Sequence, residues 1–334
     1  MPGNKPASEI RRLAGMPAPL GAYDADIIIL AYGRENETKE AIASALAQRG
    51  GNFHVSVLDQ GSPPQTRYNI ATTFGKAARF AFYTTEQNTG VAGGRNLISA
   101  QGHGQIIIAL DNDSVFEHPW VAARAVEAFQ RRPELGALGF CILAQDRRQP
   151  DLTSWGYPKS LLGRYRGRFE TTTFVGAGHA IRRLTWERIG GYDPRFFFTW
   201  EEYDFCLRAI ALGWRIAYDG SLGVIHKVSP EARINWSEQR MTCFVRNRLL
   251  IGRKWKQSWL ALTPRIVGYL IKAHRHGCQK AALEGVRAAL RLDIQPHHPM
   301  PHQLRRYIAE HETRHRGSWL NRLRTELFGR LPTA

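Results

Sequence analysis

Short, uniformly apolar runs recur along the first third of the chain. Each is six or seven residues long and rich in Ile, Val, Leu, Phe or Ala. Runs of this length without polar alternation are typical of strands that are buried on both faces of a sheet. The predicted strands cover residues 26–31, 53–59, 79–85 and 105–111.

Segments with apolar residues at helical spacing lie between these runs. The predicted helices cover residues 38–49, 93–101 and 119–130. Strands that alternate with helices predict an α/β fold, with a mainly parallel, Rossmann-like sheet flanked by helices. Ligands of such sheets bind at the carboxyl ends of the strands, where Asp59 and Asp111 stand.

The alternation becomes less regular after residue 139. The later predicted elements are strands at 174–182, 214–218 and 222–225, helices at 185–189 and 202–212, and a long loop at 152–169. The last part is helical and basic, with interruptions expected at Pro264 and from Pro296. The chain is therefore expected to divide into a loose N-terminal tail (1–22), an α/β domain (23–228) and a basic helical region (229–334).

The charge is concentrated in that helical region. The 334 residues carry a formal net charge of +17. Residues 229–334 contain 20 Lys and Arg against 7 Asp and Glu, a net +13, whereas the other 228 residues carry only +4. So basic a balance indicates an anionic partner, either nucleic acid, a membrane surface or a phosphate-bearing substrate.

Cysteine usage and the lack of long apolar segments indicate the compartment. The four cysteines are scattered without a C-x-x-C pair, as expected for buried thiols in a reducing compartment. No apolar run approaches the ~18 residues of a membrane span, and the N-terminus lacks the apolar core of a signal peptide. We expect a cytoplasmic protein, and peripheral contact with the inner face of a membrane stays open.

Two polar motifs follow the predicted strands. Asp111-Asn112-Asp113 places two carboxylates directly after the strand at 105–111, where they could hold Mg²⁺ or Mn²⁺ beside substrate phosphates, or simply form a turn. The loop at 88–96 carries three glycines and Arg95, which suits close approach of a phosphate but equally suits an ordinary glycine-rich loop. It matches neither G-x-G-x-x-G nor the P-loop, so the usual dinucleotide and NTPase sites are not indicated.

A third motif combines carboxylates with aromatic rings. Glu201, Glu202 and Asp204 begin a predicted helix, where the helix dipole alone favours acidic residues. Aromatic residues crowd the same segment at 196–203, and a carboxylate beside apolar rings can have its pKa raised toward that of a general base. Aromatic faces also suit sugar rings.

The order of these motifs resembles that of family 2 glycosyltransferases, in particular bacterial rhamnosyltransferase-like members. The resemblance covers residues 24–255 and rests on seven segments, each weak alone. They are AYGRE (31–35), VLDQGS (57–62), NTGVAGGRN (88–96), LDND (110–113), GAGHAIRR (176–183), GGYDPRF (190–196) and EEYDFCLR (201–208).

The resemblance implies a GT-A fold and a set of site residues. The half up to about residue 115 would bind the nucleotide-sugar and the half after it the acceptor. Asp59 matches an Asp that accepts the imide N–H of uracil or thymine, and Arg95 an arginine that faces the diphosphate. The implied nucleotide-sugar residues are Ala31, Tyr32, Arg34, Asp59, Asn88, Gly90, Gly94, Arg95, Asp111 and Asn112. The implied acceptor residues are Trp200, Gly176 and His179.

The resemblance also implies the metal ligands and the general base. Asp113 would bind Mn²⁺ or Mg²⁺ directly, with Asp111 and His226 beside it. Glu202 matches the family's base, but here the usual Glu-Asp pair is Glu-Glu, so Glu201 and Asp204 stay alternatives.

The implied function is inverting, metal-dependent transfer of a sugar from a UDP- or dTDP-sugar, such as dTDP-rhamnose, to an acceptor hydroxyl in bacterial surface glycan assembly. Two other classes remain open from the residues alone: a membrane-surface or nucleic-acid binding protein that uses the basic helices, and a nucleotidyltransferase. No nucleic-acid motif is present, so the expected partners are a nucleotide-sugar donor and a glycan or lipid-linked acceptor. For the basic helices two interpretations stay open: contact with an anionic membrane, or packing on the α/β domain with a solvated basic face.

Overall fold

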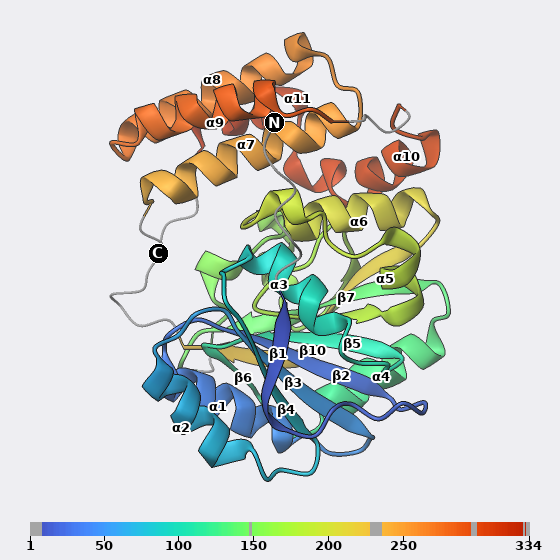
Figure 1. Cartoon of the computed structure of the whole chain (residues 1–334). Coiled ribbons are helices and arrows are strands. Elements are labelled where there is room, and N and C mark those ends of the chain that lie inside the picture. The colour runs from blue at the N-terminus through green and yellow to red at the C-terminus, as the bar shows by residue number, and fades with distance from the viewer. Residues whose placement is uncertain (1–8, 147–148, 228–235, 295–298, 330, 332–334) are drawn as a thin grey trace.

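The computed structural model describes residues 9–146, 149–227, 236–294, 299–329 and 331. These residues form one ten-stranded sheet with helices on both faces and a layer of C-terminal helices beyond one of them (Figure 1). The strands are β1 (Ile10–Gly15), β2 (Ala25–Ala31), β3 (Phe53–Asp59), β4 (Phe80–Thr85), β5 (Ile106–Asp111), β6 (Ser114–Phe116), β7 (Leu135–Leu143), β8 (Arg168–Glu170), β9 (Gly178–Arg182) and β10 (Arg215–His226). The sheet order is β1-β4-β3-β2-β5-β9-β7-β10-β6, and β8 pairs with β10.

Helices connect the strands and then form the C-terminal layer. They are α1 (Glu35–Leu46), α2 (Pro64–Phe74), α3 (Gly90–Ser99), α4 (Val121–Arg131), α5 (Arg183–Ile189), α6 (Glu201–Ala211), α7 (Glu238–Lys254), α8 (Trp259–Arg275), α9 (Gln279–Arg291), α10 (His302–His311) and α11 (Trp319–Phe328). None of the helices in the described ranges is long and apolar enough to cross a bilayer.

The parallel part of the sheet is as the sequence predicts. Strands β4, β3, β2 and β5 are parallel neighbours, and nearly every residue in them is buried. In the register, Asp59 lies opposite Ala31 and Asp111 opposite Leu30. The two carboxylates therefore flank the carboxyl end of β2.

The second half of the sheet is mixed rather than parallel. Strand β9 pairs antiparallel with β5, with Gly178 opposite Leu110, and the Ala177 carbonyl accepts a hydrogen bond from the Asp111 amide. Strand β6 pairs antiparallel with β10, with Ser114 opposite His226. These two pairings bring residues of the second half to the edge where Asp111 and Asp113 stand.

Several elements differ from the expectations. Residues 10–15 of the predicted loose tail form β1, an edge strand paired with β4, and residues 1–8 lie outside the described ranges. Helix α2 and strand β7 were not predicted, because α2 buries only Ile70 and so has no apolar stripe, while β7 is interrupted by Gly136 and Gly139, a residue type that strands disfavour. Helix α8 continues through Pro264, which stands in its second turn, so the predicted interruption there is wrong.

The C-terminal helices share a core with the α/β part. Leu250 and Ile251 of α7 and Leu304 and Tyr307 of α10 belong to the same buried cluster as Phe205 of α6. The Tyr307 hydroxyl also exchanges hydrogen bonds with the Ile216 backbone of β10, at 3.1 and 3.0 Å. Helices α7 and α10 are therefore packed directly against the α/β part of the molecule.

Candidate active site

A buried arginine lies at the centre of the candidate site. Arg95 of α3 is 3% exposed. Its Nη2 donates to Asp111 Oδ1 at 3.0 Å and to the Gly176 carbonyl at 2.8 Å, and its Nη1 donates to Glu202 Oε1 at 3.2 Å. One guanidinium thus joins the end of β5, the segment before β9 and the start of α6, which are far apart in the sequence.

Asp59 has one carboxylate oxygen engaged and one free. Its Oδ1 accepts hydrogen bonds from the backbone amides of Gly61 at 3.1 Å and Ser62 at 3.0 Å. Its Oδ2 is buried and has no hydrogen-bond partner, and the residue as a whole is inaccessible to solvent. A buried acceptor without a partner is unfavourable, so this oxygen suits a donor group supplied by a ligand. Tyr32, which follows β2, is 62% exposed.

The glycine-rich loop is shaped by its neighbours. Asn88 Oδ1 accepts from the Gly90 amide, and Gly90 adopts φ +75°, where a side chain would meet the Phe197 carbonyl. A side chain at Gly94 would meet Gln60, whose amide group bonds to Thr89 and Gly90. The loop is therefore packed between the turn after β3 and the segment before α6.

The second carboxylate of the D-x-D motif faces two cations. Asp113 forms an ion pair with Arg34, and its Oδ1 lies 3.4 Å from His226 Nε2. His226 Nδ1 lies 2.8 Å from Asp151 Oδ2. Burial by itself lowers the pKa of His226, but hydrogen bonds to Asp113 and Asp151 prevail and raise it to about 10. Asn112, between the two aspartates of the D-x-D motif, donates from Nδ2 to Thr38 Oγ1 at 3.0 Å and so fixes the turn.

The residues at this turn have the donor chemistry of a hard cation site. Asp111 and Asp113 offer carboxylate oxygens, the ligands that Mg²⁺ and Mn²⁺ prefer, and these ions commonly complete their coordination with substrate phosphates. Among the described residues, no group of three or more His, Cys, Asp and Glu side chains is arranged to hold a metal ion by itself. The carboxylates are instead neutralised by Arg95, Arg34 and His226, so a metal would have to share or displace these contacts.

The three acidic residues of α6 have different surroundings. Glu202 touches Arg95 and keeps part of its side chain, 15%, accessible. Burial raises the pKa of Glu202 and the Arg95 charge opposes that shift. Glu201 is 2% exposed, burial and the neighbouring Glu202 raise its pKa, and its Oε2 has no partner. Asp204 is fully buried, and both of its carboxylate oxygens are engaged: Oδ1 accepts from Lys254 Nζ at 2.6 Å and Oδ2 from Arg208 Nε at 2.8 Å.

The predicted acceptor residues do not form one set. Gly176 lies directly beside Arg95 and Glu202, and a side chain there would meet Glu202 Oε1. Trp200 precedes α6 with its indole N–H buried and without a partner. His179 is buried, 4.2 Å from the Phe174 ring centroid, with its nitrogens bonded to the Val175 carbonyl and the Tyr192 hydroxyl. His179 thus packs beneath the site rather than facing an acceptor.

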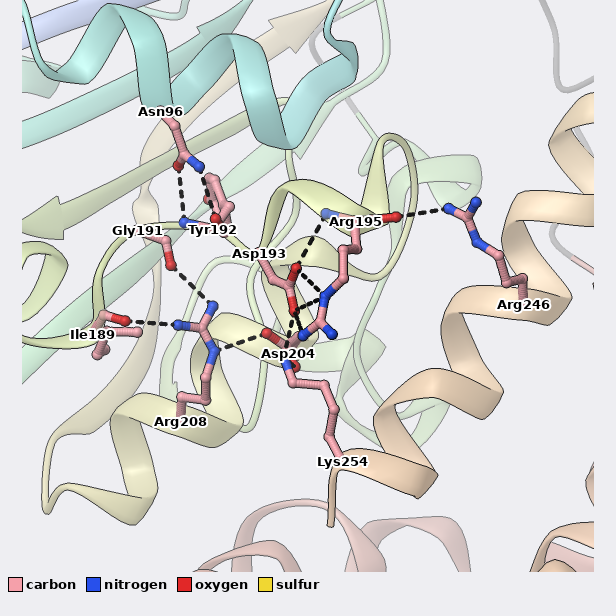
Figure 2. A network of polar contacts seen from close by, with 10 residues as sticks. All are labelled: Asn96, Ile189, Gly191, Tyr192, Asp193, Arg195, Asp204, Arg208, Arg246 and Lys254. Atoms are coloured by element: carbon pink, nitrogen blue, oxygen red, sulfur yellow. Dashed lines mark hydrogen bonds and ion pairs between the residues drawn. The ribbon is translucent and has the colours of Figure 1, made fainter. Parts of the chain in front are cut away.

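Sequence reasoning missed several residues that support this site. Asp151 has no signal in its loop, because only the fold brings it to His226. On α7, Asn247 and Lys254 hold the segment around α6. Figure 2 shows Lys254 in contact with Asp193 and Asp204. The segment at 244–249 resembles a family motif, but the sequence left open whether its Arg and Asn face the site or cap the core.

Two solved structures are similar to this chain in fold. The mannosyltransferase PcManGT from Pyrobaculum calidifontis, solved with GDP-Man and Mn²⁺, has a TM-score of 0.55 at 15% identity, over 84% of this chain and 79% of that one. GalNAc-T7, solved with UDP, GalNAc and Mn²⁺, has a TM-score of 0.58 at 14% identity, over 81% of this chain and 58% of that one. The fold is therefore of the GT-A type, as the sequence predicts.

Comparisons of the sequence add a family match and a relative. Residues 26–189 match the family described as Glycosyl transferase family 2. The UDP-Glc:alpha-D-GlcNAc-diphosphoundecaprenol beta-1,3-glucosyltransferase WfgD of Escherichia coli is 30% identical over 100 residues, which are 30% of this chain and 37% of that relative. The matched stretch thus spans little more than a third of that relative. Residues 26–189, which contain Asp59, Arg95, Asp111 and Asp113, are therefore similar to family 2 glycosyltransferases.

The raised pKa of His226 predicts a pH dependence of stability in the protein without divalent ions. A folded-state pKa of about 10, above the usual 6.5, means that protonated His226 stabilises the folded state. This contribution is complete below about pH 6.5 and disappears as the pH rises through 10. In EDTA, wild type should exceed His226→Gln in urea midpoint at pH 7, and the gap should close by pH 10. A gap that stays constant over this range would contradict the assignment.

Proposed function

We propose that the protein is an inverting, metal-dependent glycosyltransferase that uses UDP- or dTDP-sugars, dTDP-rhamnose among them, in bacterial surface glycan assembly. The observation that carries the proposal is the Arg95 cluster. It places a carboxylate with a raised pKa, Glu202, on the same guanidinium as Asp111 of the D-x-D motif. A base and a group that faces a leaving diphosphate must both lie close to the reacting sugar carbon, and in this cluster the candidates for the two roles lie within a few ångströms of one another.

The chain's own residues supply most of the chemistry. Asp59 Oδ2 accepts the imide N–H of the pyrimidine, and Arg95 donates to the diphosphate as negative charge develops on it. Glu202 removes the proton from the acceptor hydroxyl, whose oxygen then bonds to the anomeric carbon while the bond from that carbon to the diphosphate oxygen breaks. A single displacement inverts the configuration. Asp113 and Asp111 would hold Mn²⁺ or Mg²⁺, which when bound adds positive charge at the leaving group.

The base assignment predicts a loss of rate without a loss of donor binding. Glu202→Gln keeps the size of the side chain but cannot accept the proton, so kcat should fall roughly 100- to 10,000-fold. The affinity for UDP with Mn²⁺, measured by calorimetry, should stay within a few-fold. Glu201→Gln is the matched control, because Glu201 is buried beside it. If Glu201→Gln lost activity and Glu202→Gln kept it, the roles of the two residues would be reversed.

The assignment of Asp59 Oδ2 to the pyrimidine base predicts which nucleotide-sugars bind. In a thermal-shift screen with Mn²⁺, UDP- and dTDP-sugars should stabilise the protein and GDP-sugars should not. Asp59→Ala should weaken UDP binding about tenfold, the effect of losing one hydrogen bond to a charged group. Stabilisation by GDP-mannose equal to that by UDP-sugars would overturn pyrimidine selection.

We further propose that the acceptor is carried on an anionic membrane. The diphosphoundecaprenol acceptor in the name of the Escherichia coli relative supports this. So do helices α8 and α9, which expose Trp259 (39%), four further apolar side chains and several basic ones. The four further apolar residues are Leu260 (84%), Val267 (41%), Leu283 (40%) and Leu290 (52%), and the exposed basic residues are Arg275, Lys280, Arg287 and Arg291. Apolar side chains flanked by Lys and Arg are typical of surfaces that lie on anionic bilayers.

This surface predicts sedimentation with lipid vesicles. The full chain should sediment with phosphatidylglycerol vesicles and much less with phosphatidylcholine vesicles, and high salt should release it. Leu260→Asp with Leu290→Asp should weaken the binding roughly tenfold or more, since each change removes apolar burial and adds a repelled charge. Leu212→Asp, at a leucine that is 61% exposed after α6, is the control. Equal binding by both variants would contradict this surface.

A further inference from the structure

The segment before Glu202 has an unfavourable backbone. Phe197, Thr199 and Trp200 have φ of +49°, +71° and +71°, in the region that side-chain-bearing residues rarely adopt. Such a backbone is strained and persists only where surrounding contacts hold it. Residues 196–200, called here the base loop, therefore need an external support.

Asn247 of α7 supplies that support. Its side chain is fully buried, and its Nδ2 lies 2.7 Å from the Phe196 carbonyl, 2.8 Å from that of Phe198 and 2.9 Å from that of Thr199. Its Oδ1 accepts from Arg246 Nε at 2.9 Å, which fixes the orientation of the amide. The Asn247 amide nitrogen, which carries two hydrogens, thus lies within hydrogen-bond distance of three backbone carbonyls of the base loop.

Two further side chains of α7, those of Arg246 and Lys254, hold the flanks of the base loop (Figure 2). Arg246 Nη2 donates to the Arg195 carbonyl at 2.8 Å, just before the loop. Lys254 Nζ, also buried, donates to Asp193 at 2.9 Å and to Asp204 at 2.6 Å, before and after the loop. These contacts tie α7 to both ends of the segment that carries Glu202.

The opposite side of the loop touches the donor half. The Phe197 carbonyl accepts from the Val91 amide at the start of α3 at 2.6 Å, and α3 also carries Arg95. A displacement of the loop would therefore move Glu202 relative to the guanidinium that it contacts at 3.2 Å. The loop has no glycine that could relieve the strain.

We propose that Asn247 is a positioning residue, which acts on the reaction by holding the base loop in the conformation that presents Glu202. The inference rests on the proposed function, since it assigns Asn247 an effect through Glu202. The C-terminal helical region then has a part in the reaction itself, through α7, in addition to any contact with a membrane. Misplacement of a reacting group by about 1 Å can lower a rate about 100-fold.

The first test compares two variants of one helix. Asn247→Leu keeps the approximate size of the side chain but leaves three carbonyls without their donor, and kcat should fall roughly 10- to 100-fold with the KM for donor changed less than about threefold. Val245→Ala, a buried residue of α7 that packs toward α9, should lower the unfolding midpoint while keeping kcat. Because Asn247→Leu could unfold the chain, Arg246→Met is the milder variant, with a smaller loss of kcat expected. Unchanged kcat in a folded Asn247→Leu, or an equal loss in Val245→Ala, would overturn the proposal.

The second test is a double-mutant cycle between Asn247 and Glu202. If Asn247 acts through Glu202, Asn247→Leu should lower turnover in wild type but have little further effect on the residual turnover of Glu202→Gln. An equal fold-loss in both backgrounds would refute the coupling even with Glu202 as the base. Full activity of Glu202→Gln would instead remove the proposed base, and a loss in Asn247→Leu would then come from another group, which also overturns the inference.

Discussion

A buried guanidinium joins the two halves of the candidate site. Arg95 carries a positive charge with almost no access to water, and such a charge is tolerated only where partners compensate it. The partners come from β5, from the segment before β9 and from α6. The antiparallel placement of β9 beside β5 and the direction in which α6 starts both serve to bring these acceptors to one point.

The contact between Arg95 and Glu202 also depends on helix α7 of the C-terminal layer. Glu202 can reach Arg95 only because the loop before α6 follows a path that its own residues disfavour. Asn247 and Lys254 of α7 hold that path from the side opposite the sheet. The family match ends at residue 189, yet the contacts that support the base come from residues 246–254. The candidate site is thus in contact with the basic helices, whose net charge alone suggested an anionic partner.

The pattern of the sequence was informative where a residue's neighbours in the chain determine its place. The strands before Asp59 and Asp111 are buried runs whose carboxyl ends meet at one edge of a parallel sheet. The position of these two carboxylates at a common edge was therefore predictable. Strand β1 was not, because only its pairing with β4 orders a short segment that carries Arg11 and Arg12. For His179 the motif suggested an acceptor contact, whereas in the structure its ring packs against Phe174. This packing depends on residues outside the motif.

The sequence by itself determined the α/β class, the sheet edge where Asp59 and Asp111 lie, and the set of carboxylates, because period, turn residues and motif order are local properties. Only the tertiary structure distinguished among the acidic residues of α6. It paired Asp204 with Lys254 and Arg208, buried Glu201, and left Glu202 on Arg95 with access to solvent. The distinction depends on which charges lie within a few ångströms, and those charges come from α3 and α7, about 110 residues before Glu202 and about 50 after Asp204.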